Sequence, residues 1–209
     1  MTIIDIIRQK GHLYKVVLSD ESSFLADKDV CENIPLVKGK ELSREEITEI
    51  LKTSDYERAK SRALWFLDRG DRTEKGLYEK IIAGGISPEG AAKAVARFKE
   101  LGLIDDRRFA RNFAERCAGS NISKRQTYQK LMQKGVPKDI IKEVLDETET
   151  DETAQVLAVI KRKYANKLDT RENTAKVVAA LMRKGFMYPA VKEALRVYGE
   201  ELEYIDGEE

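Results

Sequence analysis

Cysteine, histidine and tryptophan are scarce in this sequence of 209 residues, which contains two cysteines, one histidine and one tryptophan. Cys31 and Cys117 lie far apart in the chain, and such a pair is typical of free thiols rather than of a disulfide framework or a zinc site. The histidine, His12, lies in an alternating, strand-like pattern with no nucleophile motif beside it, which argues against a nucleophilic triad. We therefore expect no catalytic residue, no bound metal and no cofactor.

Long apolar runs are also absent. No stretch approaches the roughly 20 apolar residues that a membrane-spanning helix needs. Asp5 interrupts the short apolar stretch between Met1 and Lys10, which is untypical of a signal peptide. Charged residues make up 36% of the chain and apolar residues 42%, a composition that supports small cores beneath a charged surface. We expect a folded cytoplasmic protein without membrane contact.

Three glycines stand fifty residues apart, and each ends a helix-like run and precedes an apolar residue: Gly85, Gly135 and Gly185. Glycine commonly ends helices because it adopts the left-handed conformation without strain. Residues that can cap a helix start recur at the same spacing: Thr73, Ser123 and Asn173. A further helical pattern lies on each side of every capped run, so the sequence predicts a three-helix unit present in three copies.

These patterns predict the fold class: mainly α, an elongated array of three tandem three-helix repeats with a small N-terminal β-rich segment. The expected divisions are residues 1–52, the β-rich segment with short helices; 53–104, 105–150 and 151–199, the three repeats; and 200–209, an acidic tail.

Local signals set further expectations. Ser43 matches the capping-box pattern for a helix expected to end near Lys52, and Ser54 matches it for a separate helix that opens the first repeat. The linker between the first two repeats is short and apolar, which predicts that they dock as one body. The linker 146–152 is acidic and polar, which predicts a hinge between the second and third repeats.

The net charge of +1 conceals an uneven distribution. Residues 53–199 contain 30 basic and 21 acidic residues, a net charge of +9, whereas residues 200–209 contain six acidic and no basic residues. This asymmetry predicts contact with a polyanion, or masking of a basic face by the tail. The candidate binding residues are Arg69, Arg72, Lys75, Arg108, Arg111, Arg116, Lys124, Arg125, Lys130, Lys161, Arg162, Lys163, Arg183 and Lys184. The alternative for each is an ordinary solvated surface, where ion pairs contribute little.

Two further groups have a structural and a functional interpretation. Asp105 and Asp106 could suggest a metal-dependent nuclease, but a helix start explains the pair and no third acidic ligand is evident nearby. The helical aromatic residues are expected in the core rather than on a base-stacking platform: Trp65, Phe66, Phe98, Phe109 and Phe113. The exposure of Trp65 is the observation that would favour stacking.

The segment Gly102–Ala110, with the sequence Gly-Leu-Ile-Asp-Asp-Arg-Arg-Phe-Ala, is similar to the signature between the first two repeats of the RecX family. Leu131–Val136 follows at a suitable distance, and Ala63–Thr73, running on to Ile81, is a second match. The resemblance covers about residues 54–199, and residues 1–52 resemble the extra β-rich segment of longer family members.

This resemblance implies a non-enzymatic regulator of the RecA recombinase in DNA repair, homologous recombination and the SOS response. Such a protein binds the RecA nucleoprotein filament, lies in its helical groove, blocks strand exchange and favours disassembly. Direct contact with single- or double-stranded DNA is compatible with this role, and we expect a monomer. The alternatives are a DNA-binding regulator built from tandem helix-turn-helix-like units and a helical adaptor protein.

Overall fold

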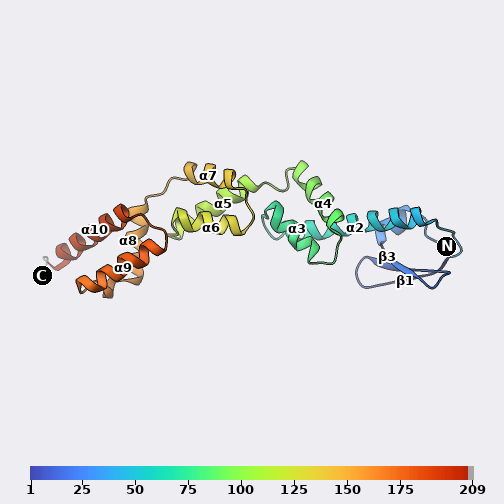
Figure 1. The fold of residues 1–209 in the computed structure, drawn as a ribbon, viewed down its shortest axis with the longest axis horizontal. Helices are drawn as coiled ribbons and strands as arrows, with labels where there is room; N and C mark the ends of the chain where they lie inside the picture. Colours follow the sequence, from blue (N-terminus) through green and yellow to red (C-terminus); the bar gives the residue numbers. More distant parts are fainter. Residues whose placement is uncertain (207–209) are drawn as a thin grey trace. The chain divides into compact units, whose positions relative to one another are not determined.

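The structure, a computed structural model, describes residues 1–206. It divides into two compact units, one from Met1 to Asp105 and a second that begins at Asp106. Figure 1 shows the strands at the start of the first unit and the helices that follow in both. In the described part of the chain, no helix is long and apolar enough to cross a membrane.

The first unit begins with a three-stranded antiparallel sheet of β1 (Ile3–Arg8), β2 (Leu13–Leu18) and β3 (Ser23–Asp27), in that order. Alternation along each strand turns one face of the sheet inward. This face packs on α1 (Lys28–Asn33) and on the first half of α2 (Arg44–Leu67). The core between them includes Ile3, Val16, Leu18, Ala26, Val30 and Ile50.

Helix α2 runs without interruption from Arg44 to Leu67, so the predicted break between Lys52 and Ser54 is wrong. Ser43 caps its start in a capping box, as the sequence predicts. Ser54 lies buried in the helix interior, where its hydroxyl accepts the backbone N–H of Asp27 at the end of β3. The serine thus joins the helix to the sheet, and no glycine or proline near it interrupts the helix.

The three predicted repeats are present, and the mainly α-helical fold with a small N-terminal sheet is confirmed. The first repeat consists of the second half of α2, α3 (Glu74–Ile82) and α4 (Pro88–Glu100). The second consists of α5 (Asp106–Gly119), α6 (Lys124–Gln133) and α7 (Lys138–Glu147). The third consists of α8 (Glu152–Lys163), the 3-10 turn η1 (Ala165–Lys167), α9 (Arg171–Arg183) and α10 (Tyr188–Asp206).

The fifty-residue period is visible in the backbone and in the cores. The three glycines have φ angles of 75°, 83° and 84°, in the left-handed region that the sequence predicts for helix ends: Gly85, Gly135 and Gly185. Three aliphatic residues fifty apart are completely buried, one in the core of each repeat: Ile81, Leu131 and Leu181. Each repeat therefore builds its own small core around the middle helix of the three.

The third repeat departs from the predicted register. Thr170, not Asn173, caps α9, and the Thr170 hydroxyl accepts the backbone N–H of Asn173. The Asn173 side chain instead donates to Asp169, which fixes the turn before the helix. Helix α10 continues to Asp206 and so includes most of the segment expected as an acidic tail, whose residues 207–209 lie outside the described part of the chain.

The hinge predicted between the second and third repeats is wrong, whereas the predicted docking of the first two repeats stays a prediction. The boundary between the compact units falls at Asp105 and Asp106, between the first and second repeats, while the second and third repeats belong to one unit. The hinge was predicted from the polarity of the linker 146–152. The contacts that join the second and third repeats come instead from two polar side chains outside this linker, Ser123 and Gln155.

Candidate functional site

The candidate basic residues fall into several separate groups, and the first lies on α5. The candidates Arg108, Arg111 and Arg116 lie there together with Arg107, which was not a candidate, and we call these four arginines the α5 surface. Glutamates of α7 partly neutralise it, because Arg107 Nη2 lies 2.7 Å from Glu147 Oε1 and Arg111 Nη2 lies 3.6 Å from Glu147 Oε2. Arg107 also pairs with Glu143, and this hydrogen bond, with the nearby negative charges, raises the pKa of its guanidinium above the ordinary value.

Other predicted cations have structural contacts of their own. Lys124 donates from Nζ to the carbonyl of Leu145 at 2.8 Å and so caps the last turn of α7. Arg116 is exposed and extends over the ring of Phe113, with 5.9 Å between its guanidinium carbon and the ring centroid. Lys130 is exposed in the last turn of α6, where a positive charge complements the helix dipole.

Two predicted groups lie elsewhere in the chain. In the first unit, Arg69 stacks on Trp65, Lys75 lies 3.8 Å from Glu79, and Arg72 is partly buried just before the cap of α3. In the third repeat, the run Lys161, Arg162 and Lys163 forms the last turn of α8. Its distance from the start of α8 is roughly 15 Å along the helix axis, because each residue adds about 1.5 Å.

The structure brings four predicted cations together where the second and third repeats meet. Ser123 at the start of α6 donates from its hydroxyl to the carbonyl of Lys184, the C-cap of α9, at 2.6 Å. The same oxygen accepts the backbone N–H of Gln126 at 3.2 Å. One serine therefore caps two helices from different repeats. The start of α6 and the end of α9 carry the four cations: Lys124, Arg125, Arg183 and Lys184.

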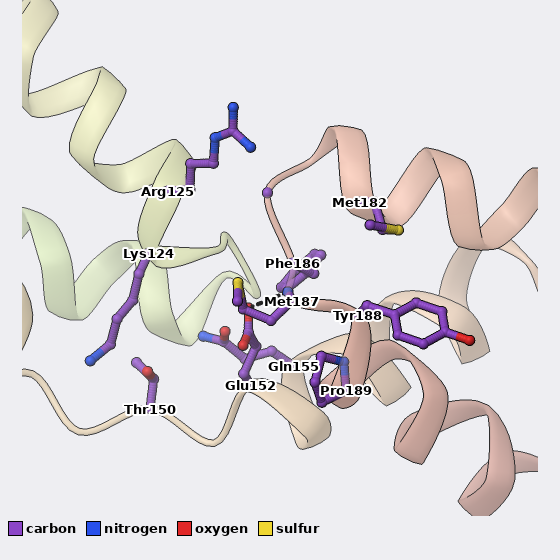
Figure 2. A pocket seen from close by; sticks show the side chains of 11 residues that line it. Lys124, Arg125, Thr150, Glu152, Gln155, Met182, Phe186, Met187, Tyr188 and Pro189 are labelled. Atoms are coloured by element: carbon purple, nitrogen blue, oxygen red, sulfur yellow. Dashed lines mark hydrogen bonds between the residues drawn. The ribbon is translucent and has the colours of Figure 1, made fainter.

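A glycine makes this close approach feasible. Gly185 has a φ of 84°, and a Cβ at this position would lie 2.8 Å from Arg125 Cβ and 2.9 Å from the Ser123 hydroxyl oxygen. A second bond joins the repeats, because Gln155 of α8 donates from Nε2 to the carbonyl of Ala118 at 3.0 Å. Within the third repeat, Glu152 accepts the backbone N–H of Met187 at 3.0 Å, which fixes the turn before α10 (Figure 2).

These contacts surround a cleft of about 610 Å³ at the joint, which we call the junction cleft. Its lining includes Lys124, Arg125, Met182, Phe186, Met187 and Tyr188. Figure 2 shows the two α6 cations on one side of the cleft and Met182 and Tyr188 on the other. Met182, Met187 and Tyr188 are 44%, 64% and 53% exposed, so apolar surface faces solvent beside positive charge.

Two arginines at the junction are not neutralised. Among residues 1–200, whose side chains are described, neither Arg125 nor Arg183 has an ion-pair partner, in contrast to Arg107 and Arg111. Tyr188, the first residue of α10, borders the cleft, and Asp206, the last, is 18 residues further along the chain. The backbone at the end of α10 is therefore roughly 27 Å from the cleft along the helix axis.

The lining of the cleft offers charged and apolar groups for noncovalent binding. Guanidinium, ammonium, thioether and phenol groups can hold an acidic and partly apolar surface by charge pairing and burial. Within the described residues, no group of three or more histidine, cysteine, aspartate or glutamate side chains could hold a metal ion, and Asp105 with Asp106 belongs to no such group.

Sequence reasoning missed half of the cleft. The candidates did not include Gln155, which bonds across the joint, Glu152, which fixes the turn before α10, or the exposed apolar residues Met182, Met187 and Tyr188. One signal was available: Met187 and Tyr188 lie two and three residues after the third glycine, at positions where the other copies have Ser-Pro and Pro-Lys.

The fold defines a class: proteins built from tandem three-helix repeats behind a small N-terminal sheet. Comparison with known proteins identifies the family. A family model for the second three-helix domain of RecX matches residues 105–145. The regulatory protein RecX of Streptococcus pneumoniae is 31% identical over 90% of this chain and 74% of its own length. The chain therefore belongs to the RecX family of regulatory proteins.

Other relatives agree. The regulatory protein RecX of Caldanaerobacter subterraneus subsp. tengcongensis is 29% identical over 91% of this chain and 95% of its own length. Two solved structures share the fold. A crystal structure of a regulatory protein RecX has a TM-score of 0.66 at 24% identity and covers 93% of this chain and 98% of its own. RecX from Lactobacillus salivarius has a TM-score of 0.61 at 19% identity and covers 69% and 96%.

Proposed function

We propose that this protein binds the RecA nucleoprotein filament as a noncovalent, monomeric regulator and inhibits recombinase activity, with the junction cleft as a principal contact. The observation that carries the proposal is that Arg125, which lacks an acidic partner among residues 1–200, lines one cleft with the exposed Met187 and Tyr188. Arg183, which also lacks such a partner, lies at the end of α9, next to Lys184. Arginine, methionine and tyrosine are the residues enriched at protein–protein interfaces. Membership of the RecX family supplies RecA as the expected partner.

The charge distribution supports the same partner. Residues 53–199 carry a net charge of +9, which attracts a filament that contains DNA phosphates and acidic protein surface. Cations outside the cleft, among them Arg108, Arg116, Lys130 and Lys161–Lys163, would then steer the encounter and contact DNA phosphates directly. The exposed apolar side chains at the cleft would add contacts that depend little on salt.

A strand-exchange assay tests the proposal. The protein, added at substoichiometric concentration to RecA filaments from the same organism, should inhibit both strand exchange and DNA-dependent ATP hydrolysis. A regulator that acts only on free DNA would instead need enough protein to cover the DNA. Its inhibition of strand exchange would rise in proportion to the fraction of DNA covered. The absence of any effect on the cognate RecA would contradict the proposal.

The alternative of a DNA-binding regulator has a separate test. Its affinity for random and candidate duplexes, measured across a range of salt concentrations, should differ strongly between sequences, because specific sites are typically bound about 10³-fold or more tightly. Equal affinities with a steep dependence on salt would indicate phosphate contacts alone, which the RecA proposal accommodates.

A further inference from the structure

A second cleft lies in the first unit, between the β1–β2 turn and one face of α2. Its volume is about 510 Å³, within the roughly 300–1,000 Å³ of typical ligand sites. Helix α2 contributes Arg58, Arg62, Trp65 and Phe66, whose spacing of four, seven and eight residues from the first places them on one face of the helix. Lys10 borders the cleft from the turn. We call this site the tryptophan cleft.

Trp65 is the large aromatic residue whose exposure the sequence left open, and 52% of it is exposed. Neighbours hold the ring in place. The Arg69 guanidinium carbon lies 3.8 Å from the ring centroid, and Arg69 Nη1 donates to the Trp65 carbonyl at 2.8 Å. Phe66 meets the ring edge-on, with 4.8 Å between centroids. A fixed indole with half its surface in solvent is suited to stack on a flat ligand rather than to fill a core.

Arg62 is fixed equally well and keeps its charge available. Its Nε donates to the Lys80 carbonyl at 2.9 Å, and its guanidinium carbon lies 5.3 Å from the Phe66 centroid. Gly84 leaves room for this group, because a Cβ there would collide with the guanidinium. Among residues 1–200, Arg62 and Lys10 have no carboxylate partner.

The acidic groups near the cleft already have partners in the protein. Asp55 pairs with Arg58 at 3.1 Å, and Asp68 lies 3.8 Å from Arg69. Asp27 borders the cleft, but it is buried and caps α1 by accepting the Asp29 N–H at 3.1 Å. The cleft therefore presents an exposed indole beside two cations that can accept a ligand anion.

We propose that the tryptophan cleft binds a nucleotide unit of a single-stranded nucleic acid, with the base stacked on Trp65 and a phosphate held by Arg62 and Lys10. Aromatic side chains beside cations are the usual means of binding unpaired bases, because every base has a flat face. A duplex keeps these faces covered by neighbouring base pairs. The inference rests on the proposed function only for its choice of DNA as ligand, and it requires no RecA.

The chain has a single tryptophan, so its fluorescence reports on this cleft directly. Titration of the intact protein with a short oligo(dT) should quench Trp65 emission, because stacking on a base quenches indole. A duplex of equal length and inorganic polyphosphate should bind by charge with little quenching. Equal quenching by thymidine monophosphate would support the same chemistry and assign the site to free nucleotides.

Variants test the two contacts by anisotropy of a labelled oligo(dT). Trp65→Leu should weaken binding about tenfold, and Trp65→Phe should restore most of it, since phenylalanine still stacks. Arg62→Gln should weaken binding about threefold and reduce its dependence on salt. Matched controls in the same repeat should bind normally: Leu101→Ala, whose side chain is also 52% exposed, and Arg97→Gln, an exposed arginine paired with Glu100.

Two results would overturn the inference: oligo(dT) binding that leaves Trp65 fluorescence unchanged, or Trp65→Leu with unaltered affinity. Quenching by an acidic, aromatic peptide but not by oligo(dT) would assign the cleft to a protein partner and would also overturn it. Because these measurements contain no RecA, a negative result with intact inhibition of strand exchange would refute the tryptophan cleft alone.

Discussion

The α5 surface and the junction cleft are both rich in cations, but they differ in what surrounds those cations. Arg107 and Arg111 face glutamates of α7 that share their charge. Arg125 and Arg183 have no such partner among residues 1–200, and Arg125 lines the same cleft as the exposed Met187 and Tyr188. The number of arginines in a segment is therefore a poor guide to a binding surface. Whether each arginine is available to a partner depends on the carboxylates that the fold places beside it.

The largest expected effect comes from the apolar side of the junction cleft. Replacing both Met187 and Tyr188 by aspartate should weaken binding to RecA filaments by about tenfold or more. The change removes apolar area that the complex would bury, and the new carboxylates would repel an acidic partner surface. Pelleting of filaments with labelled protein measures this. Leu101→Asp, at an equally exposed apolar position of the first repeat, is the control. If the control loses as much affinity as the double variant, the apolar side of the junction cleft is no more important for binding than other exposed apolar positions.

Alanine substitutions compare Gly185, which lies where the second and third repeats meet, with Gly85, whose helix end has no such neighbour. Gly85→Ala should lower the free energy of unfolding by about 1 kcal/mol, since only its left-handed φ of 75° opposes a side chain. Gly185→Ala should cost about 2–3 kcal/mol, because the new Cβ would also crowd Arg125 and Ser123. Denaturant unfolding of each variant measures the difference. Equal losses would show that the two repeats do not approach as closely as described.

Serine caps allow a similar test with a smaller effect. Ser43→Ala removes an exposed capping box and should cost about 1 kcal/mol. Ser123→Ala should cost about 2 kcal/mol, because the Lys184 carbonyl also loses its donor. Thermal and denaturant unfolding give both values. A loss at Ser123 no larger than that at Ser43 would indicate that the bond across the repeats contributes nothing.

The smallest effect is expected on the α5 surface. Glu147→Gln releases Arg107 and Arg111 from a shared carboxylate, and because surface ion pairs contribute little, stability should not change measurably. Affinity for RecA filaments should rise by no more than about twofold, through stronger long-range attraction. A tenfold gain in the same pelleting assay would reverse the ranking and make the α5 surface the main contact.

Much of the fold follows from local signals in the sequence. The glycine stops at Gly85, Gly135 and Gly185 act through their own φ angles, and Thr73 and Ser123 cap helices through neighbouring amides, so spacing alone locates them. Ser54 shows the limit of such reasoning. Its capping pattern is genuine, but its hydroxyl bonds Asp27, a partner 27 residues away that only the fold supplies.

The candidate site was less predictable for the same reason. Lys124 and Arg125 could be selected from the sequence as cations, but their proximity to Lys184 depends on the Ser123 hydroxyl reaching a carbonyl 61 residues away. The role of Lys124 in capping α7 is equally non-local. Charge is readable from composition, whereas pairing, burial and the meeting of separate repeats are properties of the packed structure.

The most direct test of the account compares charge reversal at the two surfaces. We predict that the double variant Arg125→Glu and Arg183→Glu loses inhibition of RecA-driven strand exchange at substoichiometric concentration, while Arg107→Glu with Arg111→Glu retains most of it. Both variants change the net charge by the same amount, so bulk electrostatics cancels in the comparison. Equal loss in both would show that net charge alone drives the interaction, and selective loss in the α5 variant would contradict the junction cleft as the principal contact.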